Sequence, residues 1–95
     1  AEMAVLCETA RLLYQKAASN QDLGLPYTKM ASLAKYWGGE AAMKVSTDAV
    51  QVYGGYGYTK DYLVEKYFRD AKIFQIFEGT AQVQKIVIAG DVFRN

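Results

Sequence analysis

Apolar residues recur every three or four positions along most of the chain, the spacing that places side chains on one face of an α-helix. Over residues 1 to about 21 this stripe consists of Met3, Leu6, Ala10, Leu13 and Ala17. Asn20, Asp22 and Gly24 then end the first predicted helix, and Pro26 allows the next to begin, because a first-turn residue needs no amide donor. Since the link is short, the two helices are expected to pack antiparallel.

A second helix is predicted from about Thr28 to Tyr53, and at about 1.5 Å per residue it would span about 40 Å. Its inward positions are Met30, Leu33, Ala34, Trp37, Ala41, Val45, Ala49 and Val52. The pair Gly38-Gly39 interrupts this helix, at a cost of about 1 kcal/mol for each glycine relative to alanine. Either the close approach of another helix or a kink would explain the pair.

Two shorter helices are predicted in the remainder of the chain, over residues 63 to about 73 and 80 to about 93, the latter with Thr80 as its N-cap. In the third helix, Glu65 stands four residues before Arg69, the favourable order for an exposed ion pair. The apolar faces of the two helices are Val64, Tyr67, Phe68 and Ala71, and then Val83, Ile86, Val87 and Gly90. No β alternation persists, so we expect an all-α fold, a four-helix bundle or a fragment of one.

Composition suggests that part of the apolar surface is covered by something outside the chain. Of the 95 residues, 52% are hydrophobic, a high share for a single domain that can bury only part of its apolar surface. The chain also begins in helical register, without a capping residue or initiator methionine. We therefore expect a homo-oligomer, a dimer or tetramer, or a segment of a longer protein, with residues 1–95 forming one domain.

Charge and residue usage exclude several classes of function. The net charge is +1, with no dense basic cluster, so no nucleic-acid partner is expected. A single cysteine and the absence of histidine argue against disulfides, a zinc or other metal site, and a histidine-based nucleophilic triad. No run of about 18 apolar residues is long enough for a membrane span, and no signal peptide is visible. The expected setting is a bacterial cytoplasm or a mitochondrial matrix.

Glu78 is the strongest candidate for chemistry, because it is a carboxylate set into an apolar run. Ile76 and Phe77 precede it, and Gly79 and Thr80 follow at the start of a predicted helix. Burial there would make the carboxylate more basic and suit it to accept a proton near neutral pH. The alternative is a glutamate on the exposed rim of a helix end, capping a backbone amide.

Two glycine-containing segments could contact a ligand. The turn from Gln51 to Tyr58 contains Gly54, Gly55 and Gly57, whose backbone a flat or phosphorylated ligand could approach closely. It follows a helix and not a strand, so a helix C-cap is the alternative. The segment 79–82 opens a helix, where free amides favour an anion or a carbonyl oxygen, and simple capping is again the alternative. We expect the tyrosines of the turn, Trp37 and Cys7 to pack in the core.

Three motifs in this order and spacing resemble the C-terminal helical domain of acyl-CoA dehydrogenases. They are residues 48–58 (DAVQVYGGYGY), 69–72 (RDAK) and 75–84 (QIFEGTAQVQ). The similarity extends over the whole chain and implies a segment of a longer enzyme whose other two domains hold much of the flavin and the thioester. Phe77, Leu63 and Gly38-Gly39 depart from the common pattern.

The resemblance implies a role for each matching residue. Glu78 would be the catalytic base that removes the α-proton of an acyl-CoA thioester, while FAD accepts the β-hydrogen as hydride to give a trans-2-enoyl-CoA. Gly79 would contact the substrate. Two further segments would contact FAD, the first of them on the neighbouring subunit of a dimer: Gln51, Val52, Tyr53, Gly54 and Gly55, and then Thr80, Ala81 and Gln82.

The resemblance also implies short- or medium-chain acyl-CoA substrates, a place in fatty acid β-oxidation and an electron-transferring flavoprotein as the acceptor of electrons. An acyl-CoA oxidase, which reduces oxygen instead, is the alternative enzyme. An isolated helical assembly module without activity is the alternative outside enzymology.

Overall fold

The computed structural model describes residues 1–94, in which helices account for all regular secondary structure and no strand occurs. The elements are α1 (Glu2–Asp22), α2 (Thr28–Tyr53), the 3-10 helix η1 (Gly54–Tyr58), α3 (Val64–Ala71), the 3-10 helix η2 (Lys72–Gln75) and α4 (Ala81–Val92). The prediction of an all-α fold with four helices is confirmed for this part of the chain. The third helix is shorter than predicted, because its last turn tightens into η2.

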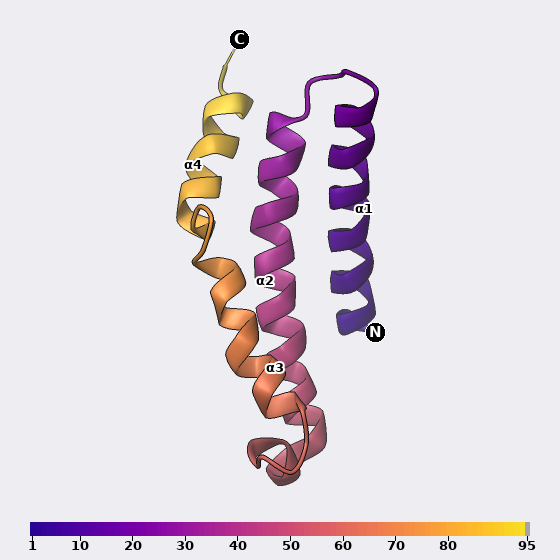
Figure 1. Cartoon of the computed structure of the whole chain (residues 1–95), viewed down its shortest axis with the longest axis vertical. Helices are drawn as coiled ribbons and strands as arrows, with labels where there is room; N and C mark the ends of the chain where they lie inside the picture. Colours follow the sequence, from indigo (N-terminus) through magenta and orange to yellow (C-terminus); the bar gives the residue numbers. More distant parts are fainter. Residues whose placement is uncertain (95) are drawn as a thin grey trace.

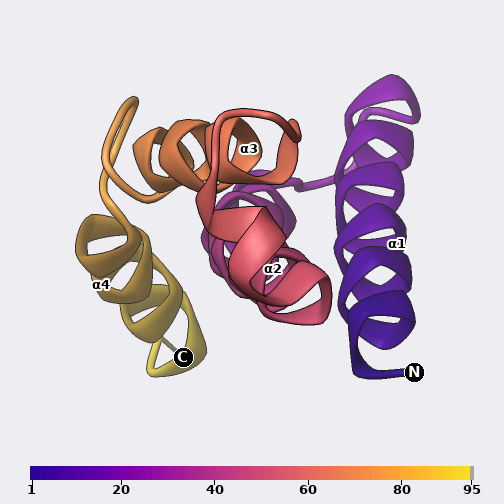
Figure 2. The same cartoon turned by 90° about the horizontal axis from the view of Figure 1, so that it is seen from below.

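The long helix α2 is the axis of the molecule, and the other elements pack along it (Figure 1). α1 lies antiparallel on one side, as predicted, while α3, η2 and α4 return along the other side. The view along α2 in Figure 2 shows α1 and α4 on opposite sides of it, with α3 against a third side. The described chain is therefore elongated, 50 × 22 × 20 Å.

Packing between α1 and α2 follows the predicted stripe, whose five residues are all partly buried. Two polar contacts fix the pair. The indole Nε1 of Trp37 donates to Thr9 Oγ1 at 2.7 Å, and the side chain of the buried Asn20 donates to the Pro26 carbonyl at 3.3 Å. The first contact joins α1 directly to α2, and the second holds the end of α1 to the link that leads into α2, so both favour the antiparallel arrangement.

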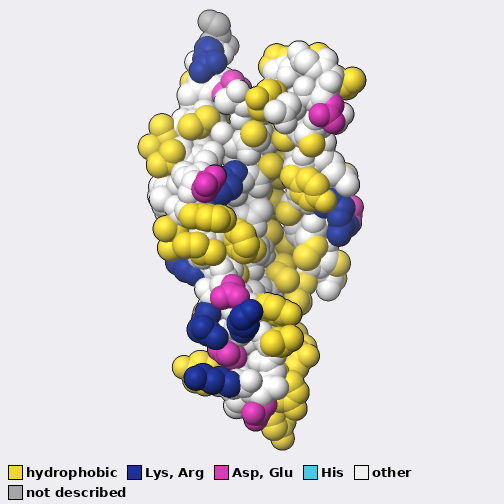
Figure 3. Space-filling model, viewed as in Figure 1, with side chains coloured by type: hydrophobic (Ala, Val, Ile, Leu, Met, Phe, Trp, Pro, Cys, Tyr) yellow, Lys and Arg dark blue, Asp and Glu magenta, His cyan; other side chains and the backbone are white. Residues whose placement is uncertain are grey.

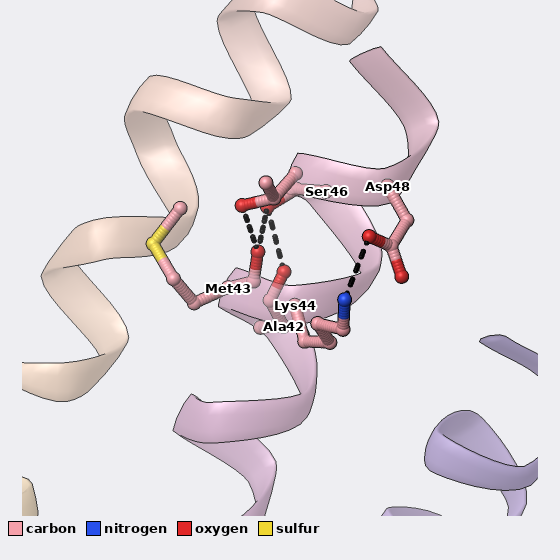
Figure 4. Close-up of polar contacts among 6 residues, drawn as sticks. Ala42, Met43, Lys44, Ser46 and Asp48 are labelled. Carbon is pink, nitrogen blue, oxygen red and sulfur yellow. Dashed lines mark hydrogen bonds and ion pairs between the residues drawn. The ribbon is translucent and has the colours of Figure 1, made fainter. Parts of the chain in front are cut away.

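Small residues on α2 let its neighbours approach closely. Its buried positions are Ser32, Gly39, Ala41 and Ser46. The Ser46 hydroxyl donates to the Ala42 carbonyl one turn earlier, at 2.7 Å, so it is satisfied without a partner on another helix (Figure 4). On the exposed side of the same turns, Lys44 pairs with Asp48 at 3.0 Å, and this hydrogen bond raises the pKa of Lys44.

The glycine pair has two different environments. A Cβ built at Gly39 would lie 2.8 Å from the Phe74 carbonyl oxygen and 3.3 Å from the Phe74 carbonyl carbon, whereas one built at Gly38 would meet nothing within 4 Å. Of the two explanations offered by the sequence, close approach therefore holds at Gly39. α2 continues unbroken past both residues.

Several predicted core positions lie on the surface of this chain. Val52 is 77% exposed, Cys7 is exposed, and Tyr67 and Phe68 of α3 are 54% and 41% exposed. The apolar face predicted for α4 is not the side that contacts the rest of the chain: Val83, Ile86, Val87 and Gly90 are exposed, while the side facing the core consists of Ala81, Gln84, Ile88 and Asp91. Apolar periodicity identifies a hydrophobic face but not the element that covers it.

Polar contacts explain the orientation of α4. Asp91 pairs with Lys29 of α2 at 3.7 Å, and the ammonium of Lys85 lies 5.3 Å from the centroid of the Tyr36 ring. These contacts tie the less apolar stripe of α4 to α2, so its most apolar stripe faces outward.

An apolar groove of about 560 Å³ also remains open between α1 and α3, and small residues of α2 form its floor. Figure 3 shows the hydrophobic side chains along it.

Candidate active site

The Glu78 loop, residues 76–80, joins η2 to α4 in an unusual backbone conformation. Its start is fixed by the amides of Ile76 and Phe77, which both donate to the Ile73 carbonyl, at 3.0 and 2.9 Å. Glu78 and Gly79 then have φ values of 55° and 93°, and Glu78 has the only positive φ of a non-glycine residue in the described chain. Two consecutive residues with positive φ turn the chain sharply and project Glu78 from the loop.

Thr80 ends the loop as the N-cap of α4, as predicted. Its backbone is extended, and its Oγ1 accepts a hydrogen bond from the Val83 amide at 3.1 Å. The cap leaves the remaining first-turn amides of α4 beside the loop, where the positive end of the helix dipole lies. Ala81 is buried, so its side chain packs against the protein and only its backbone is available to a ligand.

Glu78 itself is exposed, and the apolar residues before it are exposed with it: Ile76 is 51% and Phe77 41% accessible. The expectation that these flanks bury the carboxylate is therefore not met within residues 1–94. Over the same residues no hydrogen bond or ion pair engages the carboxylate, and the capping of α4 is done by Thr80 instead. Within residues 1–94 Glu78 is thus exposed and makes no side-chain hydrogen bond or ion pair that would stabilise the fold.

The backbone conformation of residue 79 favours glycine. Its φ of 93° is strained for any residue with a Cβ. A Cβ built there would also lie 2.6 Å from Nε2 of Gln84, so the flexible end of that side chain would have to move. The downstream side of the loop, directly after Glu78, is therefore held by the Gln84 side chain over Gly79 and by the hydrogen bond of the Thr80 cap.

Contacts with α2 hold the upstream side of the loop. The ammonium of Lys35 donates to the Phe74 carbonyl at 2.7 Å and lies 5.4 Å from the centroid of the Phe77 ring. Gln75 donates to Glu40 at 3.1 Å. These contacts link residues 35 to 42 positions apart in sequence, and for that reason sequence reasoning did not identify Lys35 or Glu40.

The glycine-rich turn lies at the far end of α2. Gly54 has a φ of 65° and its amide donates to the Gln51 carbonyl, which confirms the helix C-cap. Gly57 is buried, and a Cβ there would lie 2.7 Å from the Val50 carbonyl oxygen, so the turn folds tightly onto the helix end. Cβ atoms at Gly54 and Gly55 would meet nothing within 4 Å, so this part of the backbone is open.

The tyrosines of the turn do not pack in the core. Tyr53, Tyr56 and Tyr58 are 47%, 71% and 89% exposed, and the first two make edge-to-face contacts with Tyr62 at 5.5 and 6.1 Å. The prediction of core packing is wrong here, because the turn extends beyond the end of every neighbouring helix (Figure 1).

The predicted ion pair of α3 lies beside this turn. Arg69 Nε is 2.8 Å from Glu65 Oε2, and this hydrogen bond holds the pKa of Glu65 below its usual range. Both residues, with Gln51 and Phe68, line a second cavity of about 430 Å³.

No group of three or more potential metal ligands occurs in residues 1–94, and no helix there is long and apolar enough to cross a membrane.

Glu78 and the turn at Gln51 are far apart in the structure. Phe77 lies against Lys35, and Gln51 follows Lys35 by 16 residues on the same helix. At about 1.5 Å per residue, the two predicted ligand-contacting segments are about 24 Å apart along α2. The structure therefore does not bring them together within one chain.

Comparison with known proteins shows which family has this arrangement. Residues 1–93 match the family model described as "Acyl-CoA dehydrogenase, C-terminal domain". The chain belongs to the acyl-CoA dehydrogenase family. The resemblance carried by residues 48–58, 69–72 and 75–84 is thereby confirmed.

The chain is similar in sequence to named members of the acyl-CoA dehydrogenase family. The chain is 56% identical over 94 residues to a short-chain specific acyl-CoA dehydrogenase of Clostridium acetobutylicum, covering 99% of the chain and 25% of that protein. It is 48% identical over 90 residues to the caffeyl-CoA reductase-Etf complex subunit CarC of Acetobacterium woodii, covering 95% and 24%.

The fold is shared with a solved structure, the butyryl-CoA dehydrogenase of Megasphaera elsdenii, with a TM-score of 0.95 and 46% identity over 98% of the chain and 24% of that protein. The chain spans about a quarter of the length of these relatives.

Proposed function

We propose that this chain serves as the C-terminal helical part of an FAD-dependent acyl-CoA dehydrogenase, with Glu78 as the catalytic base. The observation that carries the proposal is the state of Glu78. Its carboxylate is exposed, no group among residues 1–94 pairs with it, and it stands on a loop fixed on both sides. A positioned carboxylate without a structural partner is suited to proton transfer.

In the proposed reaction the α-carbon of the thioester loses a proton to Glu78, and the electron pair of that C–H bond forms the α,β double bond. FAD, when bound, accepts the β-hydrogen as hydride. The acyl chain would lie against the exposed Ile76 and Phe77 and exclude water from the carboxylate. The bound acyl chain would thus provide the apolar surroundings that residues 1–94 alone do not give to Glu78.

The residues predicted to contact FAD fit such a group in their backbone chemistry. Gly54 and Gly55 leave open main chain at the end of α2, and Thr80 to Gln82 form a helix N-terminus, which favours phosphate and polar ring atoms. The separation of about 24 Å between the segments supports their serving two different FAD molecules, with Gln51 to Gly55 reaching that of a neighbouring subunit.

The relatives suggest the substrate class and the partner. One is specific for short-chain substrates, one is a butyryl-CoA dehydrogenase and one is a subunit of a complex with Etf. We therefore propose a short-chain acyl-CoA as substrate, an electron-transferring flavoprotein as electron acceptor and a homo-oligomeric enzyme in a bacterial cytoplasm.

The test is Glu78→Gln in the full-length flavoprotein. The amide has nearly the shape of the carboxylate but cannot take the proton, so FAD should stay bound while anaerobic butyryl-CoA no longer bleaches the flavin band. Glu8→Gln, an exposed glutamate of α1 paired only with Arg11, is the matched control and should bleach normally. Bleaching of the Glu78 variant at the wild-type rate would refute the assignment.

A further inference from the structure

Lys35 of α2 contacts both Phe74, which precedes the Glu78 loop, and Phe77, which lies within it. We infer that Lys35 is a positioning residue for Glu78, an inference that rests on the proposed function of Glu78 as base. Lys35 holds the backbone and the aromatic side chain that lead into the loop, and thereby sets where the carboxylate stands.

Two contacts made by one ammonium group carry this inference. Lys35 Nζ donates to the Phe74 carbonyl at 2.7 Å, a charge-assisted hydrogen bond, and lies 5.4 Å from the centroid of the Phe77 ring, within the range of a cation–π interaction. Phe74 and Phe77 also contact each other edge to face, with ring centroids 5.5 Å apart. Lys35 thus binds both ends of the short segment that immediately precedes Glu78.

Contacts around the Phe74 carbonyl make its position sensitive to Lys35. On one side the missing Cβ of Gly39 leaves just enough space for the carbonyl oxygen, and on the other side Lys35 donates to it. Downstream of Phe77 the chain turns at once through the positive φ values of Glu78 and Gly79. A small shift of Phe77 therefore moves Glu78 directly, and a shift of Phe74 reaches it through only three residues.

Contacts that do not involve Lys35 also hold η2 against α2. Gln75 is tied separately to Glu40 and Lys72, and Gly39 packs against Phe74 and Gln75. Loss of the Lys35 ammonium should for this reason leave the helices in place and loosen the loop. A displacement of about 1 Å at a reacting group can cost up to about a hundredfold in rate.

The experiment compares Lys35→Met, Lys35→Arg and Lys44→Met in the full-length holoprotein. Methionine keeps an unbranched apolar side chain without charge or donor, arginine keeps both, and Lys44 is a lysine of the same helix that pairs with Asp48 away from the loop. The measured quantities are the rate constant of flavin reduction by butyryl-CoA per bound FAD, the Kd of butyryl-CoA from the substrate dependence of that rate, and the α-deuterium isotope effect.

We expect Lys35→Met to slow flavin reduction about tenfold, with the Kd changed less than twofold and a larger isotope effect. Lys35→Arg should recover most of the rate, and Lys44→Met should match wild type. A wild-type rate per bound FAD in Lys35→Met would overturn the inference, and so would an equal loss in Lys44→Met, since that would indicate a general effect of lysine removal on α2.

Two further variants keep the test decisive. If Lys35→Met does not fold, Lys35→Gln, which keeps a polar side chain but removes the charge, takes its place and should also lower the rate about tenfold. A wild-type rate there would overturn the inference. Glu78→Gln is measured in parallel: if that variant still reduces flavin normally, the proposed function fails, whereas if it is inactive and Lys35→Met is unimpaired, only the positioning role fails.

Discussion

The two adjacent glycines of α2 provide a matched pair for testing the packing described above. Gly38 and Gly39 have the same intrinsic cost in a helix, about 1 kcal/mol relative to alanine, so this contribution is equal for the two alanine variants. They differ in what a new methyl group meets: nothing within 4 Å at Gly38, and the Phe74 carbonyl oxygen at 2.8 Å at Gly39.

The magnitude follows from that distance. An ordinary contact begins at 3.4 Å, so a methyl group at Gly39 would need the backbone at Phe74 to move by about 0.6 Å. Overpacking of this kind costs about 1 to 3 kcal/mol. Gly38→Ala should therefore stabilise the chain by up to about 1 kcal/mol. Gly39→Ala gains the same helix propensity but also suffers the clash with Phe74, so it should be neutral or destabilising by up to about 2 kcal/mol.

Thermal unfolding of the 95-residue chain, followed by circular dichroism at equal protein concentration, measures the difference. For a domain of this size about 1 kcal/mol corresponds to about 4 to 8 °C, so the Tm of Gly39→Ala should lie at least about 4 °C below that of Gly38→Ala. Equal Tm values, or a more stable Gly39→Ala, would show that α2 and η2 do not pack as closely as described.

Three further predictions concern the surface of the chain. Thr80→Ala should lose about 1 kcal/mol of stability in urea unfolding, because the Val83 amide loses its cap; an unchanged midpoint would contradict this. Glu65→Gln should be less stable than wild type at pH 7, and the difference should shrink as the pH falls through the lowered pKa of Glu65, because the carboxylate contributes stability only while it stays ionised in the folded state; a constant difference down to pH 2 would refute it. The chain should self-associate in light scattering and Ile86→Lys should weaken this, since Ile86 is 71% exposed on α4; a monodisperse wild-type monomer would argue against it.

Local patterns in the sequence were sufficient to predict the helices. The bounds of α1 and α2, the cap at Thr80 and the Glu65–Arg69 pair all depend on residues within four positions of one another, which is the range of helical contacts. The family could likewise be predicted, because each of the three motifs is an unbroken stretch of sequence.

Contacts between distant segments could not be predicted in this way. The side of α4 that faces outward could not be predicted, because Lys29 and Asp91, which orient the helix, lie 62 positions apart. The support of the Glu78 loop by Lys35 was not apparent because a lysine on a long helix has no local pattern that marks it. The sequence left burial and exposure of Glu78 as alternatives, because apolar neighbours in sequence need not fold over the residue they flank.

At position 78 the residue type that would favour stability differs from the one that the proposed activity needs, because the backbone φ there is positive. A left-handed backbone costs a residue with a side chain about 1 kcal/mol, and glycine or asparagine would relieve that cost at once. Selection for stability alone would therefore tend to remove the carboxylate, whereas the proposed role of Glu78 as a base would account for a glutamate in this conformation. In stability-guided engineering of this chain, position 78 is the one to leave untouched, since a substitution that improves folding there would remove the proposed base.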